Sequence, residues 1–410
     1  MKYIYKISLL LGILIGYTGS YIHGQAQICG CTDPLAKNYN SIATINDGSC
    51  LYRSVSVKPI LSFDLSSELH ETSGLIFWDH KLWTHNDNSD QNLYSLDPAD
   101  GILIQKYPVK GITNKDWEEI SEDENYIYIG DFGNNFHGNR SDLKIYRIDK
   151  KSLLVNNPLT DSICFSYSDQ SDFSPDNYNS TDFDCEAFIV SSDSIYLFTK
   201  QWHSLQTSVY ALPKSPGKYT ARLKTTYNVH GLITGATYLE SKKILVLCGY
   251  GKTLHPFSYL LYDFKGTDFF SGNKRKIKID LPFHQTEGVA TANGLVYYFS
   301  NENFSASKIH FSGQQLHLID FSPYLHNYLF NTLGKKINIV SFYSDPACNV
   351  ISIKYNKDFY KKYSETEIGR TIILSGILKD NSFKIKANNL KKGNYFIKIG
   401  NSVVFKWGKV

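Results

Sequence analysis

With 410 residues, the chain is long enough to bury a sizeable core and to hold two or more domains. Its formal net charge of +4 is small for this length, and its densest basic run, 273–277, is typical of a solvated hairpin edge. Aromatic residues make up 14% of the sequence and long amphipathic helical patterns are hard to find, which favours an all-β protein. The small net charge and the short basic runs give no basic surface for nucleic acid, so nucleic acid is not an expected partner.

The first 26 residues have the pattern of a signal peptide. Lys2 and Lys6 precede the apolar run 7–15, and residues 24–26 are a plausible cleavage site. Because this run is too short to span a bilayer, we expect no transmembrane segment in the mature chain. Cys29 lacks the small-residue context of a lipidation box, so we expect export through the periplasm to the cell surface or the medium. That route places the seven Cys residues where disulfides form, and their odd number leaves at least one unpaired within the chain.

Residues 27–52 form a small module bracketed by cysteines. A disulfide between Cys31 and Cys50 would stabilise this short loop by about 3 kcal/mol. Its oxygen-bearing side chains either bind calcium or form turns: Asp33, Asn38, Asn40 and Asp47. The stretch from Cys29 to Cys50 resembles a module that recurs in exported proteins of bacteria with type IX secretion.

Residues 57–330 contain a unit that occurs five times. The units start near Ser73, Glu118, Glu186, Gly235 and Glu287, at steps of about 45, 68, 49 and 52 residues. Alternating apolar positions within each unit are typical of short, half-buried strands. Four strands per unit predict a five-bladed β-propeller. A sixth, degenerate blade within 151–184 is the alternative, although a loop insertion there is the preferred interpretation.

Two further expectations concern the closure of the ring. The segment VKPILSFDL, ahead of the first unit, is predicted to be an outer strand that pairs with the last blade. In the last unit the four expected strands are GVATA, LVYYFS, KIHFS and QLHLIDF.

The tail, residues 336–410, is predicted to be a small β-sandwich domain joined to the propeller by 331–335. Its strands alternate in the segments NVISIKY, TIILSGIL, SFKIKA, NYFIKI and VVFKW. The tail resembles the C-terminal sorting domain of type IX secretion cargo in its opening YSDP, in Gly369-Arg370 and in the run KGNYFIKI. It departs from that family at Ser344, Asp345 and Cys348. The resemblance implies that the type IX secretion machinery is a partner.

The repeats should bring polar side chains together at one mouth of the propeller channel. Inner strands begin there and second strands end there, so two sets of residues converge. The tips include Trp202 and Glu302, whereas Tyr250 makes the fourth sector neutral. The predicted ligand-binding residues are Glu71, His85, Asp87, Glu118, Glu119, Asp131, Asn134, Glu186, Lys200, Glu287 and Asn301.

Carboxylates so close together raise one another's pKa unless a cation intervenes. Calcium is the natural candidate outside the cell, with Glu118, Asp131 and Glu186 as its predicted ligands. Lys200 as an internal counter-ion is a second interpretation. A third is that the Glu side chains accept backbone N–H groups and hold one blade to the next.

The motif set resembles a group of secreted bacterial propellers, and more distantly the esterase-like or phytase-like propellers. It consists of ETSGL, THNDN, DWEEI, GDFGNN, DCEAF, LFTK, TGATY and TEGVA. Calcium-dependent phytases need several basic side chains to hold phosphate, but only Lys200 and Arg140 are expected near this mouth. The resemblance therefore does not carry phytase activity over to this chain.

Two functions from different classes remain open. In the first, the propeller binds a ligand, which could be a small molecule, a glycan or a protein, without catalysis. In the second, the protein is a metal-assisted hydrolase of phosphate or carboxylic esters, in which the predicted metal ligands activate water. No nucleophile elbow, HExxH motif or P-loop occurs in the sequence, so an enzymatic function is uncertain from the sequence alone.

Overall fold

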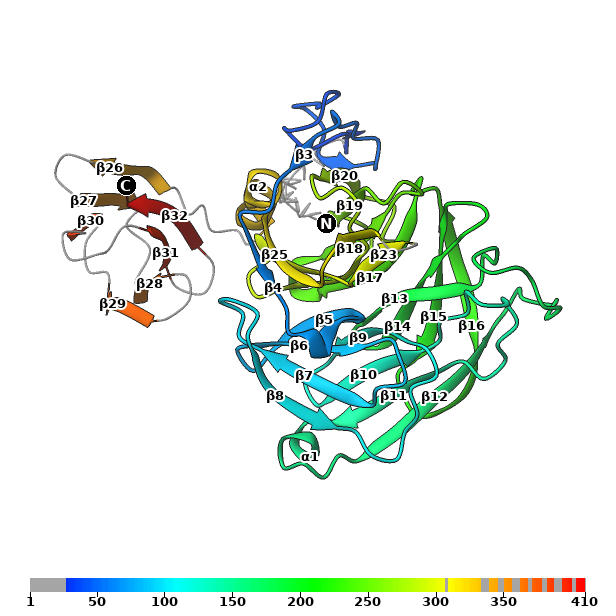
Figure 1. The fold of residues 1–410 in the computed structure, drawn as a ribbon. Helices are drawn as coiled ribbons and strands as arrows, with labels where there is room; N and C mark the ends of the chain where they lie inside the picture. Colours follow the sequence, from blue (N-terminus) through cyan, green and yellow to red (C-terminus); the bar gives the residue numbers. More distant parts are fainter. Residues whose placement is uncertain are drawn as a thin grey trace, which may run out of the picture.

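The computed structural model describes residues 27–306 and 309–332 and, further along the chain, seven strands between residues 339 and 409. Strands dominate these residues, which confirms the all-β prediction (Figure 1). The predicted signal peptide, residues 1–26, lies outside the described residues. No helix in the described part of the chain is long and apolar enough to cross a membrane.

The N-terminal module contains the predicted disulfide between Cys31 and Cys50, whose Cα atoms are 4.7 Å apart. Its two short strands are β1 (Cys29–Gly30) and β2 (Ile45–Asn46), which pair in parallel. A hydrogen bond connects the module to the ring: the Asp33 carboxylate accepts it from the Tyr262 hydroxyl at 2.6 Å. Three of the oxygens considered for calcium form turns instead, since each accepts the backbone N–H two residues later: those of Asp33, Asn40 and Asp47.

Three consecutive sheets of four antiparallel strands follow. The first contains β5 (Thr72–Trp78), β6 (Lys81–Asn86), β7 (Asn92–Leu96) and β8 (Leu103–Pro108). The second contains β9 (Trp117–Glu122), β10 (Tyr126–Asp131), β11 (Lys144–Asp149) and β12 (Thr160–Tyr167), with helix α1 (Lys150–Leu154) before β12. The third contains β13 (Asp184–Val190), β14 (Ser194–Lys200), β15 (Thr207–Pro213) and β16 (Gly217–Tyr227). Parallel pairing of the outer strands β12 and β16 joins the second and third sheets.

Two more sheets complete the ring. The fourth contains β17 (Leu232–Leu239), β18 (Ile244–Tyr250), β19 (Pro256–Tyr262) and β20 (Asn273–Ile279), and the short strand β3 (Ser56–Val57) extends it. The fifth contains β21 (Thr286–Thr291), β22 (Val296–Asn301), β25 (Gln315–Asp320) and β4 (Leu61–Asp64). The hairpin of β23 (Phe304–Ala306) and β24 (Ile309–Ser312) forms a separate sheet. Two short 3-10 helices cover Ser67–Leu69 and Glu240–Lys242.

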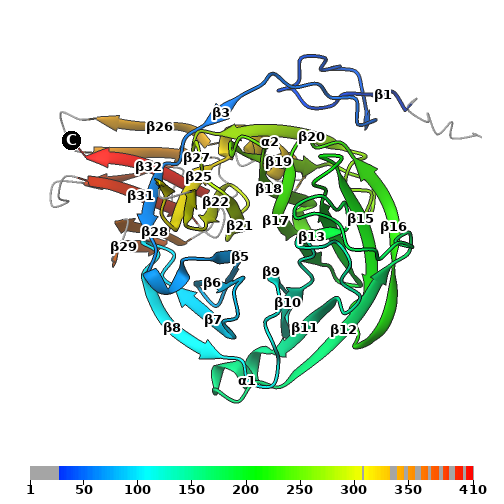
Figure 2. The ribbon, with the colours of Figure 1, turned by 45° about the vertical axis from the view of Figure 1, so that its right-hand side comes forward.

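The innermost strands contact one another in a closed ring, in the order β5, β9, β13, β17, β21 and back to β5. Figure 2 shows the sheets arranged around this common centre. Five hydrophobic clusters fill the spaces between consecutive sheets, for example that of Trp83 and Trp117 between the first and the second. Because both faces of a sheet are covered, strands such as β13 and β18 are buried along their whole length. A ring of sheets packed face to face is a β-propeller.

The N-terminal segment closes the ring, as predicted. Strand β4 pairs antiparallel with β25, with Leu61 opposite Leu318 and Asp64 opposite Gln315. Joining the two ends of the repeat region in one sheet removes an exposed edge. The strand prediction for the last unit was wrong in one respect, because KIHFS contributes to the separate hairpin. Strand β25 is therefore third, and the N-terminal strand takes the fourth place.

The long second interval contains β12 and then residues 168–183, which include no strand, as expected for a loop insertion. Cys164 and Cys185, at either side of this loop, are both free thiols.

Helix α2 (Ser322–Thr332) was not predicted, and it places Leu325 and Leu329 in the cluster between the fourth and fifth sheets. The tail strands pair only antiparallel, in two sheets. The three-stranded sheet contains β26 (Ile339–Asp345), β27 (Val350–Tyr355) and β30 (Ser382–Lys386). The four-stranded sheet contains β28 (Lys362–Glu367), β29 (Thr371–Ile377), β31 (Gly393–Ile399) and β32 (Val403–Lys409). Residues 333–335 of the predicted linker lie outside the described residues.

Candidate functional site

Every innermost strand has a β-bulge at an equivalent position. Relative to the second strand of its sheet, the register of the inner strand skips Ser73-Gly74, Glu118, Glu186, Thr234 and Glu287, respectively. A bulge redirects the side chain of the unpaired residue, and bulges are common beside functional sites. Three of the five sheets therefore present a glutamate from the same place. Ser73, rather than the predicted Glu71, is the equivalent in the first sheet, although Glu71 is also close to this mouth.

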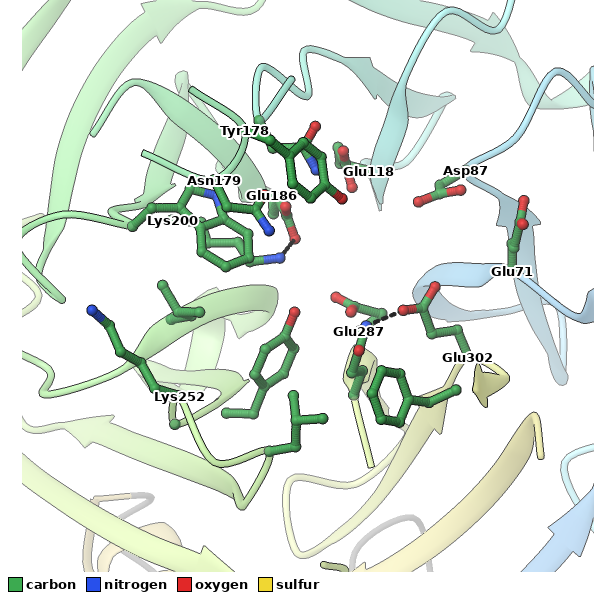
Figure 3. A pocket seen from close by; sticks show the side chains of 18 of the residues that line it. Glu71, Asp87, Glu118, Tyr178, Asn179, Glu186, Lys200, Lys252, Glu287 and Glu302 are labelled. Atoms are coloured by element: carbon green, nitrogen blue, oxygen red, sulfur yellow. Dashed lines mark hydrogen bonds and ion pairs between the residues drawn. The ribbon is translucent and has the colours of Figure 1, made fainter. Parts of the chain in front are cut away.

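The bulged glutamates line a cavity of about 690 Å³ at the centre of the ring (Figure 3). Drug-sized ligands occupy pockets of about 300–1,000 Å³, so this cavity has the size of a small-molecule site. Its acidic lining residues are Glu71, Asp87, Glu118, Glu186, Glu287 and Glu302. Its cationic lining residues are Lys200 and Lys252. Six of the eleven predicted ligand-binding residues therefore meet here: Glu71, Asp87, Glu118, Glu186, Lys200 and Glu287.

Lys200 is the internal counter-ion that the sequence allowed. Its Nζ donates to the Glu186 carboxylate at 2.6 Å, and both side chains are almost fully buried. The ammonium also lies 4.6 Å from the ring centre of Trp202 and 5.2 Å from that of Tyr250. Burial lowers the pKa of Lys200, but Glu186, Tyr250 and Glu287 outweigh this effect, and the pKa is raised well above its usual value. Lys200 is therefore held as a cation by one carboxylate and two aromatic rings.

Glu118 and Glu287 have no such partner. Glu118 is only 5% exposed and Glu287 only 7%, and both point into the cavity (Figure 3). Nothing in the described chain donates a hydrogen bond to either carboxylate or forms an ion pair with it. Burial and then the charge of Glu186 raise the pKa of Glu118 well above its usual range. For Glu287 burial has the same effect, and Lys200 opposes it only in part.

The side of the cavity opposite Lys200 is lined by three carboxyl groups, those of Glu71, Asp87 and Glu302 (Figure 3). Burial and the neighbouring Glu71 carboxylate raise the pKa of Asp87 to about 7. Burial and the neighbouring Asp87 raise the pKa of Glu302 to about 8. Glu302 also accepts a hydrogen bond from the Gln285 amide. At neutral pH a large share of the Asp87 and Glu302 carboxyl groups is therefore protonated. A cation bound beside them would favour the ionised forms and release these protons.

Aromatic side chains complete the wall: Tyr178, Trp202, Tyr250 and Phe304. Tyr178 comes from the inserted loop 168–183 and is 64% exposed, so it lies at the entrance. Phe304 comes from the β23–β24 hairpin. Trp202 and Tyr250 stand at the ends of second strands, where the repeat pattern indicated them. Tyr178 and Phe304 have no counterpart in the other repeats, so no sequence signal could have identified them.

Two predicted site residues are buried away from the cavity. His85 packs edge-on against Trp117, with its Nδ1 3.1 Å from the carbonyl oxygen of Asn86. Burial lowers the pKa of His85 to about 4, so the ring is neutral. Glu119 is fully buried, and its Oε2 accepts the backbone N–H of Ala236 at 2.7 Å. Glu119 therefore holds inner strands together, which is the third interpretation offered by the sequence.

Three other predicted residues also have structural contacts and do not line the cavity. The Asp131 carboxylate is fully buried and lies 2.9 Å from the Arg140 guanidinium. The backbone N–H of Asn134 donates to the carboxylate of Asp184 at 2.7 Å. The amide of Asn301 donates to two backbone carbonyls. The ends of the second strands are thus used mainly to fix loops in these sectors.

The predicted calcium ligands are not brought together as a set. Asp131 is engaged by Arg140, and Glu186 is engaged by Lys200. Across residues 27–306 and the other described segments, no group of three His, Cys, Asp or Glu side chains is arranged to hold a metal ion. The residues present therefore do not fit a calcium site of this composition, and calcium stays a prediction. An unchanged melting temperature in EDTA would show that calcium does not stabilise the protein.

No protein-family model and no curated protein matches the chain. Solved structures with a similar β-propeller-like fold include the PQQ-bound aldose sugar dehydrogenase of Streptomyces coelicolor (12% identity, TM-score 0.39, 65% of this chain and 98% of that one). Another is PorZ, a surface component of the type IX secretion system of Porphyromonas gingivalis (9% identity, TM-score 0.29, 82% and 44%). The RRP9 WD40 repeats are a third (7% identity, TM-score 0.32, 61% and 67%). Similarities at this level concern the fold, and no ligand or activity follows from them.

Proposed function

We propose that the protein is an exported five-bladed β-propeller that binds an extracellular ligand in its acidic central cavity. The ring of five inner strands and the four-stranded sheets support the blade number. The cavity has the volume of a small-molecule site and an opening lined by aromatic rings.

The observation that carries the proposal is the pair Glu118 and Glu287. A nearly buried carboxyl group without a protein partner is costly to ionise, which is why burial raises its pKa, and such groups are uncommon unless they have a function. Here two of them project from equivalent bulges into the same cavity. A ligand that supplies their missing partners would remove this cost.

The hydrolase alternative lacks an observation of this kind. It requires a metal ion held by Glu118, Asp131 and Glu186, and two of these are engaged by basic side chains. Nitrophenyl phosphates and nitrophenyl esters, assayed with calcium on the wild type and on Glu118→Gln, test it directly. A rate that depends on Glu118 would favour the hydrolase over simple binding.

Calorimetry of the mature chain with four probes tests the binding proposal. The probes are a neutral oligosaccharide, a linear diamine, a basic peptide and inorganic phosphate. At least one should raise the melting temperature, because a ligand stabilises the state that binds it. The increase should disappear in the double variant Glu118→Gln/Glu287→Gln and persist in Glu124→Gln, which removes an exposed carboxylate. If no probe acts, or if one acts equally on the double variant, the proposal is wrong.

The export proposal rests on the signal-peptide pattern and on the sorting-domain resemblance of the tail. Within the part of the chain that the structure describes, the tail strands pair with one another and not with strands of the ring, which supports a separate domain over 336–410. Deleting residues 336–410 should leave the propeller folded but retained in the periplasm. Fusing them to a reporter that carries a signal peptide should send the reporter outside. If the truncated protein still reaches the medium of a host with type IX secretion, the sorting assignment is wrong.

A further inference from the structure

We propose that the ligand of this cavity is an organic cation that carries primary ammonium groups on an apolar chain, as in a linear diamine. This inference rests on the proposed binding function and names the class of ligand. It is motivated by the charge of the lining, by the way Lys200 is held there, and by the two unpartnered carboxylates.

The charge of the lining selects against anions. Six carboxylates face two lysines, and the ammonium of Lys200 is already paired with Glu186. A phosphate or carboxylate ligand would add negative charge to a buried space in which burial and mutual repulsion already raise the pKa of the carboxyl groups, and such repulsion is weakly screened. A neutral ligand would leave the two free carboxylates without an ionic partner. A bound cation would favour the ionised form of these carboxyl groups, so it is the ligand class that the acidic lining favours.

Lys200 shows how an ammonium group is bound in this space. Its Nζ has one carboxylate at 2.6 Å and two aromatic ring centres at 4.6 and 5.2 Å. A charge-assisted hydrogen bond combined with cation–π contact is a favourable arrangement for a primary ammonium that has lost its water. The elements of a second such arrangement are present, since Phe304 and Tyr178 line the same cavity as Glu118 and Glu287.

Glu118 and Glu287 supply the anionic part of that arrangement. Both are more than nine-tenths buried, both line the cavity, and the described chain offers neither of them a donor. They come from different sheets, the second and the fifth, so one ligand would contact two sides of the ring. An ammonium group donates three hydrogen bonds, so a ligand with one at each end has a donor for each carboxyl group and methylenes to contact aromatic rings of the lining.

Isothermal titration of the full mature chain tests the inference near neutral pH. The probes are cadaverine, pentylamine and 1,5-pentanediol, which share a five-carbon chain and carry two, one and no ammonium groups, respectively. Cadaverine should bind most tightly, pentylamine at least tenfold more weakly, and pentanediol should give no measurable heat. Glu118→Gln and Glu287→Gln should each weaken cadaverine binding by at least tenfold, and Glu124→Gln should leave it unchanged.

The variants also report on folding in the absence of ligand. Because each change removes a buried, unpaired carboxyl group, neither Glu118→Gln nor Glu287→Gln should lower the melting temperature of the free protein. If one of them fails to fold, the other still gives the binding result. The inference is overturned if cadaverine gives no heat at about 10 mM, or if pentanediol binds equally well. Binding of a neutral oligosaccharide without cadaverine would leave the proposed function standing and remove this inference alone.

Discussion

Replacing Glu119 should destabilise the ring without touching the cavity. Its Oε2 accepts the backbone N–H of Ala236 at 2.7 Å, and its Oε1 accepts that of Ile120 at 3.0 Å. Ala236 lies on β17, which is not the neighbour of β9 in the ring, so this contact crosses the channel. A Cβ atom on Gly74 would collide with Oε1, so the first sheet approaches this carboxylate closely only because the residue there is glycine.

The size of the effect follows from these hydrogen bonds. Glu119→Gln keeps the shape of the side chain but turns one acceptor into a donor, so one of the two backbone N–H groups must face an N–H. A buried donor left without an acceptor costs about 1–3 kcal/mol. At about 2 kcal/mol, a domain of this size should lose about 4–8 °C in melting temperature.

Differential scanning calorimetry of the mature chain measures this loss. The matched control is Glu124→Gln, an exposed carboxylate in the turn between β9 and β10 of the same sheet. Burial raises the pKa of Glu119 well above its usual range, whereas the N–H groups around it lower it. If Glu119→Gln melts within about 1 °C of the control, then Glu119 does not accept both N–H groups as an ionised carboxylate, and it does not stabilise the ring in this way.

Raising the pH from about 5 to about 8 should lower the melting temperature, because Asp87 and Glu302 stay protonated in the folded state up to pKa values of about 7 and about 8 but ionise near 4 when unfolded. A flat profile in calorimetry over this range would contradict these pKa values. Lys200→Met should lower the free energy of unfolding by about 3–5 kcal/mol, because Glu186 loses its partner. The double variant Lys200→Met/Glu186→Leu should recover much of this loss. Denaturant titration of both variants measures the two values, and equal losses in both would contradict the role of the ion pair. Reducing the disulfide of the N-terminal module should cost about 3 kcal/mol, and an unchanged denaturation midpoint would show that the module contributes little.

Most of the ring was predictable from the sequence because the same pattern of strands and turns recurs in each of the five repeats. Alternating apolar residues and regular spacing indicated the strands, and the surplus strand ahead of the first unit indicated how the ring closes. The strand prediction for the last unit was wrong because KIHFS has the same alternation of apolar residues as a blade strand. Its place in the fifth sheet is taken by β25 and then by β4, from the other end of the repeat region.

The site was predictable only in part, because its geometry depends on a one-residue bulge. Glu118 and Glu119 are adjacent, yet the bulge sends the first into the cavity and leaves the second to bind backbone across the channel. Sequence spacing cannot distinguish them. Asp131 and Lys200 have equivalent places at the ends of their second strands, paired with Trp117 and Asp184, respectively. Lys200 lines the cavity, whereas the carboxylate of Asp131 forms an ion pair with Arg140 and does not. Tyr178 comes from an insertion that only one repeat has, so the repeat pattern carries no information about it.

A crystal structure of the mature chain with the probe that most raises its melting temperature would show directly whether the ligand binds in the central cavity. We expect density for that probe in the central cavity, with polar atoms about 2.7–3.2 Å from the carboxylates of Glu118 and Glu287. Probe density elsewhere on the surface, with only water beside these two carboxylates, would contradict it.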